Sequence, residues 1–149
     1  MTINRVLMGR QRIYIETAPL IYFVEENPQY VEKMEAVLKY IEQQEINAFS
    51  SVIILPEVLK RPLQEQRHDL AREYRKILID SQQFQLLPVT LSIAEQSAAL
   101  RARYNLRTPD ALHVATALNA GCDAFLTNDG GIRRVTELQI LMLDDLELE

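Results

Sequence analysis

Apolar residues along the chain follow two alternating patterns. Short runs rich in β-branched and aromatic residues predict buried strands, and longer segments with apolar residues three and four positions apart predict amphipathic helices. The expected strands are residues 12–15, 46–52, 84–89, 123–127 and 139–146. The expected helices lie between them, at residues 16–26, 28–44, 54–60, 68–82, 92–105 and 108–121.

The alternation predicts an α/β fold: a three-layer sandwich in which helices cover both faces of a five-stranded, mainly parallel sheet. A length of 149 residues suits a single domain spanning residues 1–149, in which residues 1–11 could form a flexible arm. Ligands of such folds usually bind beyond the carboxyl ends of the strands, so a functional site is expected there.

Charge and cysteine content narrow the class of protein. The net charge is −5, but four acids lie in residues 143–149, so the rest of the chain carries only −1. This argues against a simple basic nucleic-acid binder, although grouped arginines and metal ions could still hold a polyanion. The single cysteine, Cys122, cannot form an intramolecular disulfide, and no segment has the pattern of a signal peptide or a membrane span. We therefore expect a cytoplasmic protein without membrane attachment.

Four acidic residues stand near the expected strand ends and helix starts. Glu16 follows the first strand, Glu57 the second and Asp129 the fourth, while Asp110 begins a helix. Clustered carboxylates repel one another unless protons or cations compensate, and ligands that are all oxygen suit Mg²⁺ or Mn²⁺ better than zinc. If the four converge, the sequence predicts a divalent-cation site, which suits phosphodiester hydrolysis.

Some of these acids also have a structural interpretation. Pro56 and Pro109 each suit a first helical position, which would put Glu57 and Asp110 in first turns, where the helix dipole favours an anion. Thr108 is the expected N-cap of the second of these helices.

Other polar residues near the four acids are open to two interpretations. His113, one turn after Asp110, could face the site, but a lone histidine in an Ala-rich helix is expected to be packed or hydrogen-bonded, and we assign it no catalytic role. Five arginines could line a phosphate path or lie on ordinary solvated helix faces: Arg101, Arg103, Arg107, Arg133 and Arg134.

The chain resembles a PIN domain, especially the VapC-like ribonuclease toxins, in the segments IYIETAPLIYFVE, SSVIILPEVL, LRTPDALHVATALNAGCDAFLTND and VTELQILMLDDL. The resemblance covers almost the whole chain. It implies a sheet of order 3-2-1-4-5 and a ribonuclease that depends on Mg²⁺ or Mn²⁺. The catalytic, metal-binding acids would match Glu16, Glu57, Asp110 and Asp129, and Thr127 would match a supporting hydroxyl.

The resemblance also implies partners. VapC-like proteins cleave RNA, are commonly homodimers and hold an antitoxin protein in an apolar groove between helices. Residues 30–41, together with residues 20–23, could supply such apolar surface.

Two residues depart from the family pattern. Glu16 stands where an aspartate is usual, and Ala18 where Asn, Ser or Thr is usual. Because Mg²⁺ demands near-octahedral geometry, the longer ligand and the missing polar group could weaken or abolish activity. A degenerate PIN domain that binds RNA or protein without cleavage is therefore the alternative. A receiver-like phosphorylation domain shares the five-stranded plan, but no lysine follows Lys76, so its strand-end lysine is absent.

Overall fold

The computed structural model describes residues 1–82 and 84–149, and its central element is a five-stranded sheet. The strands are β1 (Arg12–Ile15), β2 (Asn47–Ser51), β3 (Phe84–Leu87), β4 (Ala124–Thr127) and β5 (Ile140–Met142). They lie in the order β3-β2-β1-β4-β5, and every neighbouring pair is parallel. The α/β fold and the sheet order expected from the sequence are therefore confirmed.

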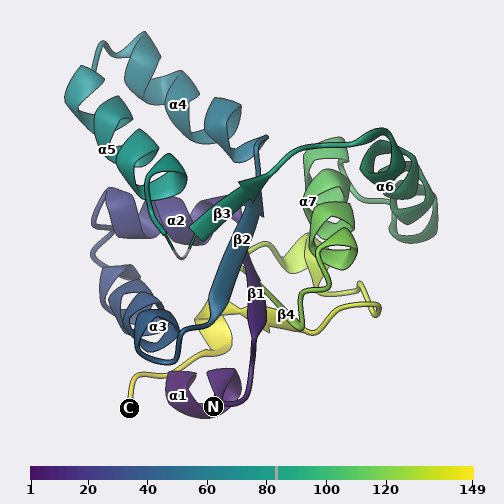
Figure 1. Ribbon diagram of the computed structural model, residues 1–149, viewed down its shortest axis with the longest axis horizontal. Coiled ribbons are helices and arrows are strands. Elements are labelled where there is room, and N and C mark those ends of the chain that lie inside the picture. The colour runs from purple at the N-terminus through teal and green to yellow at the C-terminus, as the bar shows by residue number, and fades with distance from the viewer. Residues whose placement is uncertain (83) are drawn as a thin grey trace.

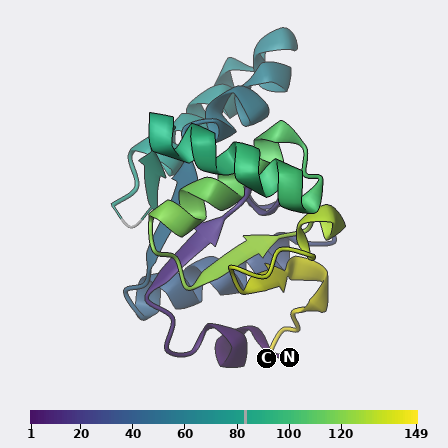
Figure 2. The ribbon, with the colours of Figure 1, turned by 90° about the vertical axis from the view of Figure 1, so that its right-hand side faces the viewer.

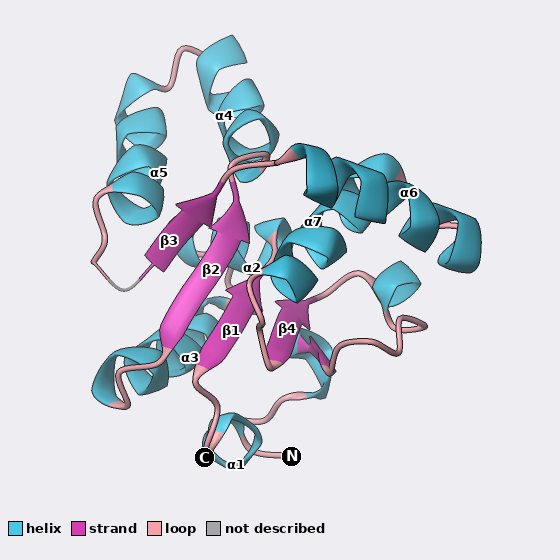
Figure 3. Ribbon diagram, turned by 45° about the vertical axis from the view of Figure 1, so that its right-hand side comes forward, coloured by secondary structure: helices cyan, strands magenta, loops and turns pink. Residues whose placement is uncertain are grey.

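Helices cover both faces of this sheet, as Figures 1 and 2 show. They are α1 (Ile3–Leu7), α2 (Thr17–Val24), α3 (Val31–Gln43), α4 (Ile54–Gln64), α5 (His68–Ile79), α6 (Leu91–Tyr104) and α7 (Thr108–Asn119). In Figure 3, α6 and α7 lie in front of the sheet and α2 and α3 lie behind it, while α4 and α5 extend beyond β2 and β3. Among the residues described, no helix is both long enough and apolar enough to span a membrane.

The two faces of the sheet bury alternate residues of the same strands. On one face, Ile13, Ile15 and Leu126 join a core with apolar residues of α1 to α5. On the other face, Tyr14 stacks on Phe125 with 4.9 Å between ring centroids, within a core that includes apolar residues of α6 and α7. Because successive side chains of a strand point to opposite faces, a sheet covered on both sides requires apolar residues at consecutive positions of each strand.

Residues 1–11 do not form the flexible arm that the sequence suggested. Ile3, Val6 and Leu7 of α1 are buried in the same core as α3. The N–H of Ile3 also donates to the carbonyl of Glu147 at 3.0 Å, which ties the N-terminal segment to the C-terminal one. A helix of five residues is too short to show a helical period in the sequence, so only its tertiary contacts reveal it.

At three helix starts, the position of a proline or a cap differs from the sequence prediction. Pro28 lies in a turn before α3, where the side chain of Asn27 accepts the N–H of Gln29 at 2.9 Å and favours a turn over a helix. Thr108 is the first residue of α7, and Arg107, with an extended backbone, takes the N-cap position. Pro109 is therefore second in its helix, and in the same way Pro56 is third in α4.

The fifth strand is shorter than the expected residues 139–146. It ends at Met142, and a 3-10 turn spans Leu143–Asp145. The N–H of Asp144 donates to Oδ1 of Asn128 at 3.1 Å rather than to a strand carbonyl, so the chain leaves the sheet there.

Candidate functional site

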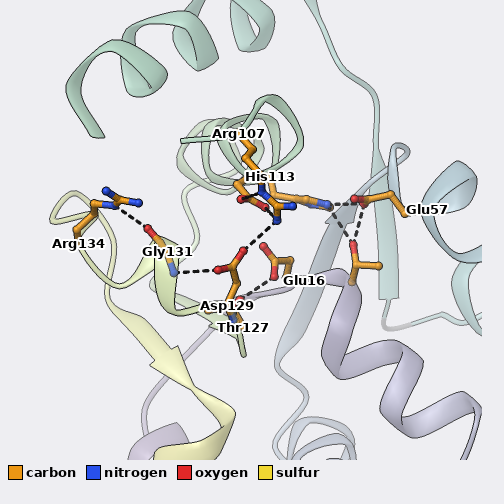
Figure 4. Close-up of polar contacts among 10 residues, drawn as sticks. Glu16, Glu57, Arg107, His113, Thr127, Asp129, Gly131 and Arg134 are labelled. Atoms are coloured by element: carbon orange, nitrogen blue, oxygen red, sulfur yellow. Dashed lines mark hydrogen bonds and ion pairs between the residues drawn. The ribbon is translucent and has the colours of Figure 1, made fainter. Parts of the chain in front are cut away.

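The four predicted site acids lie at the carboxyl end of the sheet. Glu16 follows β1 directly, and Asp129 comes two residues after β4. Glu57 and Asp110 lie in the first turns of α4 and α7. Since β1 and β4 are neighbouring parallel strands, their carboxyl ends meet at one edge of the sheet. Figure 4 shows Glu16 beside Asp129, with Glu57 set further to the right.

Glu16 is a buried carboxyl group with one satisfied oxygen. Its side chain is only 5% exposed, and its Oε1 accepts the hydroxyl of Thr127 at 2.7 Å. Its Oε2 is buried and has no hydrogen-bond partner among the residues described. Burial raises the pKa of Glu16 to about 7, and the nearby carboxylates of Asp110 and Asp129 act in the same direction. An unpartnered buried oxygen of this kind gains by meeting a cation.

Asp129, in the segment LTNDGG, is held in place by hydrogen bonds that involve the backbone. Its N–H donates to Oγ1 of Thr127 at 3.0 Å, and its Oδ1 accepts the N–H of Gly131 at 2.8 Å. A Cβ atom at position 131 would lie 3.2 Å from this Oδ1, so glycine leaves room for the contact. Asp129 therefore belongs both to a tight turn and to the site, and Thr127 links it to Glu16.

Arg107 joins Asp110 to Asp129. Its Nε and Nη2 donate to the two carboxylate oxygens of Asp110 at 3.0 and 3.4 Å, and Nη2 also reaches Oδ2 of Asp129 at 3.2 Å. Burial raises the pKa of Asp110 and the charge of Asp129 adds to this, while the hydrogen bond from Arg107 opposes it. The two aspartates thus share one guanidinium, which offsets their mutual repulsion.

Glu57 is held by a separate group of side chains. Its Oε1 accepts the hydroxyl of Thr17 at 2.8 Å and contacts Nε2 of His113 at 2.8 Å. Burial pushes the pKa of Glu57 up, but the hydrogen bonds from His113 and Thr17 and the nearby positive charge together outweigh it, and the pKa is lowered. Glu57 is therefore maintained as a carboxylate.

His113 is packed and hydrogen-bonded, as the sequence predicted. It is 1% exposed, and its Nδ1 contacts the hydroxyl of Tyr14 on β1. A histidine with its proton on Nε2 satisfies both neighbours, because the carboxylate of Glu57 can only accept and the hydroxyl of Tyr14 can donate to Nδ1. The side chain therefore connects the sheet to Glu57.

Sequence reasoning missed Tyr14 and Thr17 altogether and did not foresee that Arg107 would bridge two acids. Thr17 directly follows Glu16, and Arg107 lies one helical turn before Asp110, so their spacing was a signal that could have been used. The sequence gives no sign of a role for Tyr14, because a tyrosine is an ordinary residue in a buried strand.

The other arginines lie in different surroundings. Nε of Arg134 donates to the carbonyl of Gly131 at 2.8 Å, beside Asp129. Nε of Arg101 donates to a backbone carbonyl, and Arg103 and Arg133 form exposed ion pairs with acids outside the four. Of the five arginines, Arg107 and Arg134 are therefore the ones held beside the site.

The donor set suits a hard divalent ion. The acids supply only oxygen atoms, and Oε2 of Glu16 lacks a partner, which fits Mg²⁺ or Mn²⁺ rather than zinc. Within residues 1–82 and 84–149, however, no three His, Cys, Asp or Glu side chains stand close enough together to enclose an ion. The acids would have to draw together around a metal.

The fold and this site define a class of protein: a parallel α/β protein with carboxylates gathered beyond the carboxyl ends of neighbouring strands. The family model described as the PIN domain matches residues 13–138. The chain belongs to the PIN domain family. Among curated proteins, none matches the chain in sequence.

Solved structures share this fold. A chain of a toxin–antitoxin complex from Klebsiella pneumoniae has a TM-score of 0.64 at 20% identity, covering 88% of this chain and 97% of that one. A chain of VapBC2 from Rickettsia felis, bound to a promoter DNA fragment, has a TM-score of 0.69 at 14% identity, covering 89% and 98%. A chain of FitAB bound to the IR36 DNA fragment has a TM-score of 0.70 at 16% identity, covering 91% and 97%. At these identities the likeness shows the fold.

Proposed function

We propose that this chain is a divalent-metal-dependent endoribonuclease and the toxin of a toxin–antitoxin pair. The observation that carries the proposal is the gathering of Glu16, Asp110 and Asp129 in a PIN fold, with one buried oxygen of Glu16 left without a partner. Three carboxylates so near one another repel unless a cation compensates, and they suit a cation that binds phosphate.

Each site residue has a proposed role. Glu16, Asp110, Asp129 and Glu57 hold the ion, directly or through water. Thr127 orients Glu16 and Asp129 at once, because its hydroxyl donates to the first and accepts the N–H of the second. A bound Mg²⁺ or Mn²⁺ would supply Lewis acidity toward the phosphate and lower the pKa of an attacking water.

A specific observation favours the non-catalytic alternative, in which the domain binds RNA or protein without cleavage. Burial raises the pKa of Glu16 to about 7, so at pH 7 about half of the metal-free molecules hold this carboxyl protonated. Ala18 supplies no polar side chain on α2 to compensate. Metal binding would then cost the release of a proton, which weakens it.

The experiment that tests the proposed function is a cleavage assay on single-stranded RNA with purified protein. We expect cleavage in Mg²⁺ or Mn²⁺ and its loss in excess EDTA, with recovery when the metal is restored. Because ionised Glu16 binds metal better, the rate should also rise between pH 6 and pH 8. The rates are measured by gel electrophoresis of an end-labelled oligoribonucleotide.

The same assay separates the two candidate functions. Cleavage that persists in EDTA would contradict a metal-dependent enzyme. If the wild type is inactive but the variant Glu16→Asp/Ala18→Asn cleaves RNA, the chain is a degenerate PIN domain whose site these two residues have impaired.

For the partner, we propose an antitoxin protein that binds in an apolar groove, with the chain acting as a homodimer. A groove of about 710 Å³ lies between α2, α3, α5 and β3, and its lining includes Phe23, Leu38 and Ile77. It draws on both segments expected to supply such a surface, although Met34 and Val37 of α3 are buried in the core. An amphipathic helix could place its apolar face there.

The partner is tested with the product of an adjacent gene, by size-exclusion chromatography with light scattering. The wild type should elute as a dimer and form a complex with that product, whereas Leu38→Glu should lose the complex because a charge would be buried in the groove. Leu91→Glu is the matched control, since Leu91 is 78% exposed on α6 and does not line the groove. A wild type that elutes as a monomer would contradict the homodimer. A complex that survives Leu38→Glu would contradict the antitoxin site in the groove.

A further inference from the structure

Arg107 lies between two carboxylates that the proposed function needs for a metal ion. Its guanidinium makes ion pairs with Asp110 at 3.0 Å and with Asp129 at 3.2 Å. The side chain of Arg107 is 75% exposed, whereas that of Asp110 is 11% exposed and that of Asp129 is 32% exposed. The cation therefore lies on the more exposed side of the two aspartates. Figure 4 shows its contact with Asp129.

A divalent ion and this guanidinium would compete for the same oxygen atoms. Arg107 already takes both oxygens of Asp110 and one of Asp129. A metal bound by those oxygens would also repel the guanidinium, since both are cations. The arginine is free to leave, because its side chain is long and 75% exposed, so water can solvate the guanidinium once it is displaced.

The donors of the guanidinium suit a phosphodiester. An arginine carries five N–H donors in a planar fork that matches phosphate oxygens, and Nη1 of Arg107 makes no hydrogen bond to any residue described. A guanidinium displaced from Asp110 stays attached at the N-cap of α7, so it remains beside the site and free to pair with a phosphate there.

We propose that Arg107 is a counter-ion that a divalent ion displaces from Asp110 and Asp129, and that the displaced guanidinium binds the RNA phosphate. This inference rests on the proposed function and deepens it. It makes Arg107 a residue with two successive partners: the acids before metal enters the site, and the substrate afterwards.

Two measurements on Arg107→Gln test the inference, and they should move in opposite directions. The dissociation constant for Mn²⁺ alone, measured by electron paramagnetic resonance of the free ion without RNA, should fall roughly 2- to 10-fold because a competing cation is gone. At saturating Mn²⁺, the KM for an oligoribonucleotide should rise roughly 10-fold because a charged phosphate contact is lost. If Arg107 had a merely structural role, the substitution would weaken both Mn²⁺ binding and RNA binding.

Two variants serve as controls. Arg103→Gln removes the same charge from the neighbouring helix, where Arg103 pairs with Glu137, and it should change neither value. Arg107→Lys keeps the charge, so Mn²⁺ affinity should return to the wild-type value, but KM should stay raised because an ammonium cannot form the fork.

The outcomes separate the inference from the proposed function. If Arg107→Gln binds Mn²⁺ no more tightly than the wild type, the counter-ion role is overturned. If KM does not change, the phosphate role is overturned. If the wild type binds no Mn²⁺ at all, the metal-dependent function itself fails, and the inference fails with it.

Discussion

Replacing Asp110 by asparagine is expected to lower kcat/KM for metal-dependent RNA cleavage by about 100-fold or more, since mutating even the hydrogen-bond partners of metal ligands typically costs 10- to 100-fold. Asparagine keeps the shape of the side chain and one acceptor oxygen but removes the charge that a metal ligand supplies. The fold should hold, because Asp110 contributes little favourable charge to the metal-free protein, its pKa being raised by burial. The measurements are cleavage rates in Mg²⁺ and Mn²⁺ and unfolding in urea.

Asp69→Asn is the matched control for this variant. Asp69 also lies in the first turn of a helix and also pairs with a nearby arginine, Arg67 at 3.2 Å, but it is exposed on α5, outside the site. Its removal should leave cleavage unchanged. If Asp110→Asn cleaves as fast as the wild type, the activity comes from another site or from a contaminant.

Glu16→Gln is expected to make the metal-free protein more stable than the wild type at pH 8, by on the order of 3 kcal/mol. The pKa of Glu16 is about 7 in the folded protein against an ordinary value of 4.5, so the folded state binds the proton more tightly. The stability that this adds is complete below pH 4.5 and is lost as the pH rises to about 7. Above that pH the buried carboxylate of Glu16 lowers the free energy of unfolding, and the neutral glutamine avoids this loss.

The measurement is the free energy of unfolding in urea at pH 4.5, 6 and 8, with EDTA present. The gap between Glu16→Gln and the wild type should open as the pH rises. Glu57→Gln should behave in the opposite way: the pKa of Glu57 is lowered, so its carboxylate adds stability at neutral pH that glutamine loses. Saturating Mn²⁺ at pH 8 should stabilise the wild type more than Glu16→Gln. Parallel curves for all three proteins would disprove the unfavourable burial of Glu16.

Much of the fold, and the placement of the four acids at the carboxyl end of the sheet, could be predicted from local sequence. Glu16 directly follows the strand RIYI, and Asp129 comes two residues after the strand that ends at Thr127. Each strand and its acid can therefore be recognised from a few consecutive residues. Carboxyl ends of neighbouring parallel strands share one edge of the sheet, so acids at those positions are brought together by topology alone. The departure at Glu16 was also visible, because it concerns the identity of a residue and not its contacts.

The sequence by itself therefore determined the alternation of strands and helices and the edge of the sheet that carries the acids. The tertiary structure decided which side chain meets which. Tyr14 and His113, 99 residues apart, touch because β1 and α7 pack together, and Glu16 meets Thr127 across 111 residues. It also decided that Arg107 covers two aspartates and that residues 3–7 pack as a helix. A local sequence pattern indicates the period of a helix or a strand. The rotamer, burial and pKa of a side chain depend on neighbours that only folding brings together.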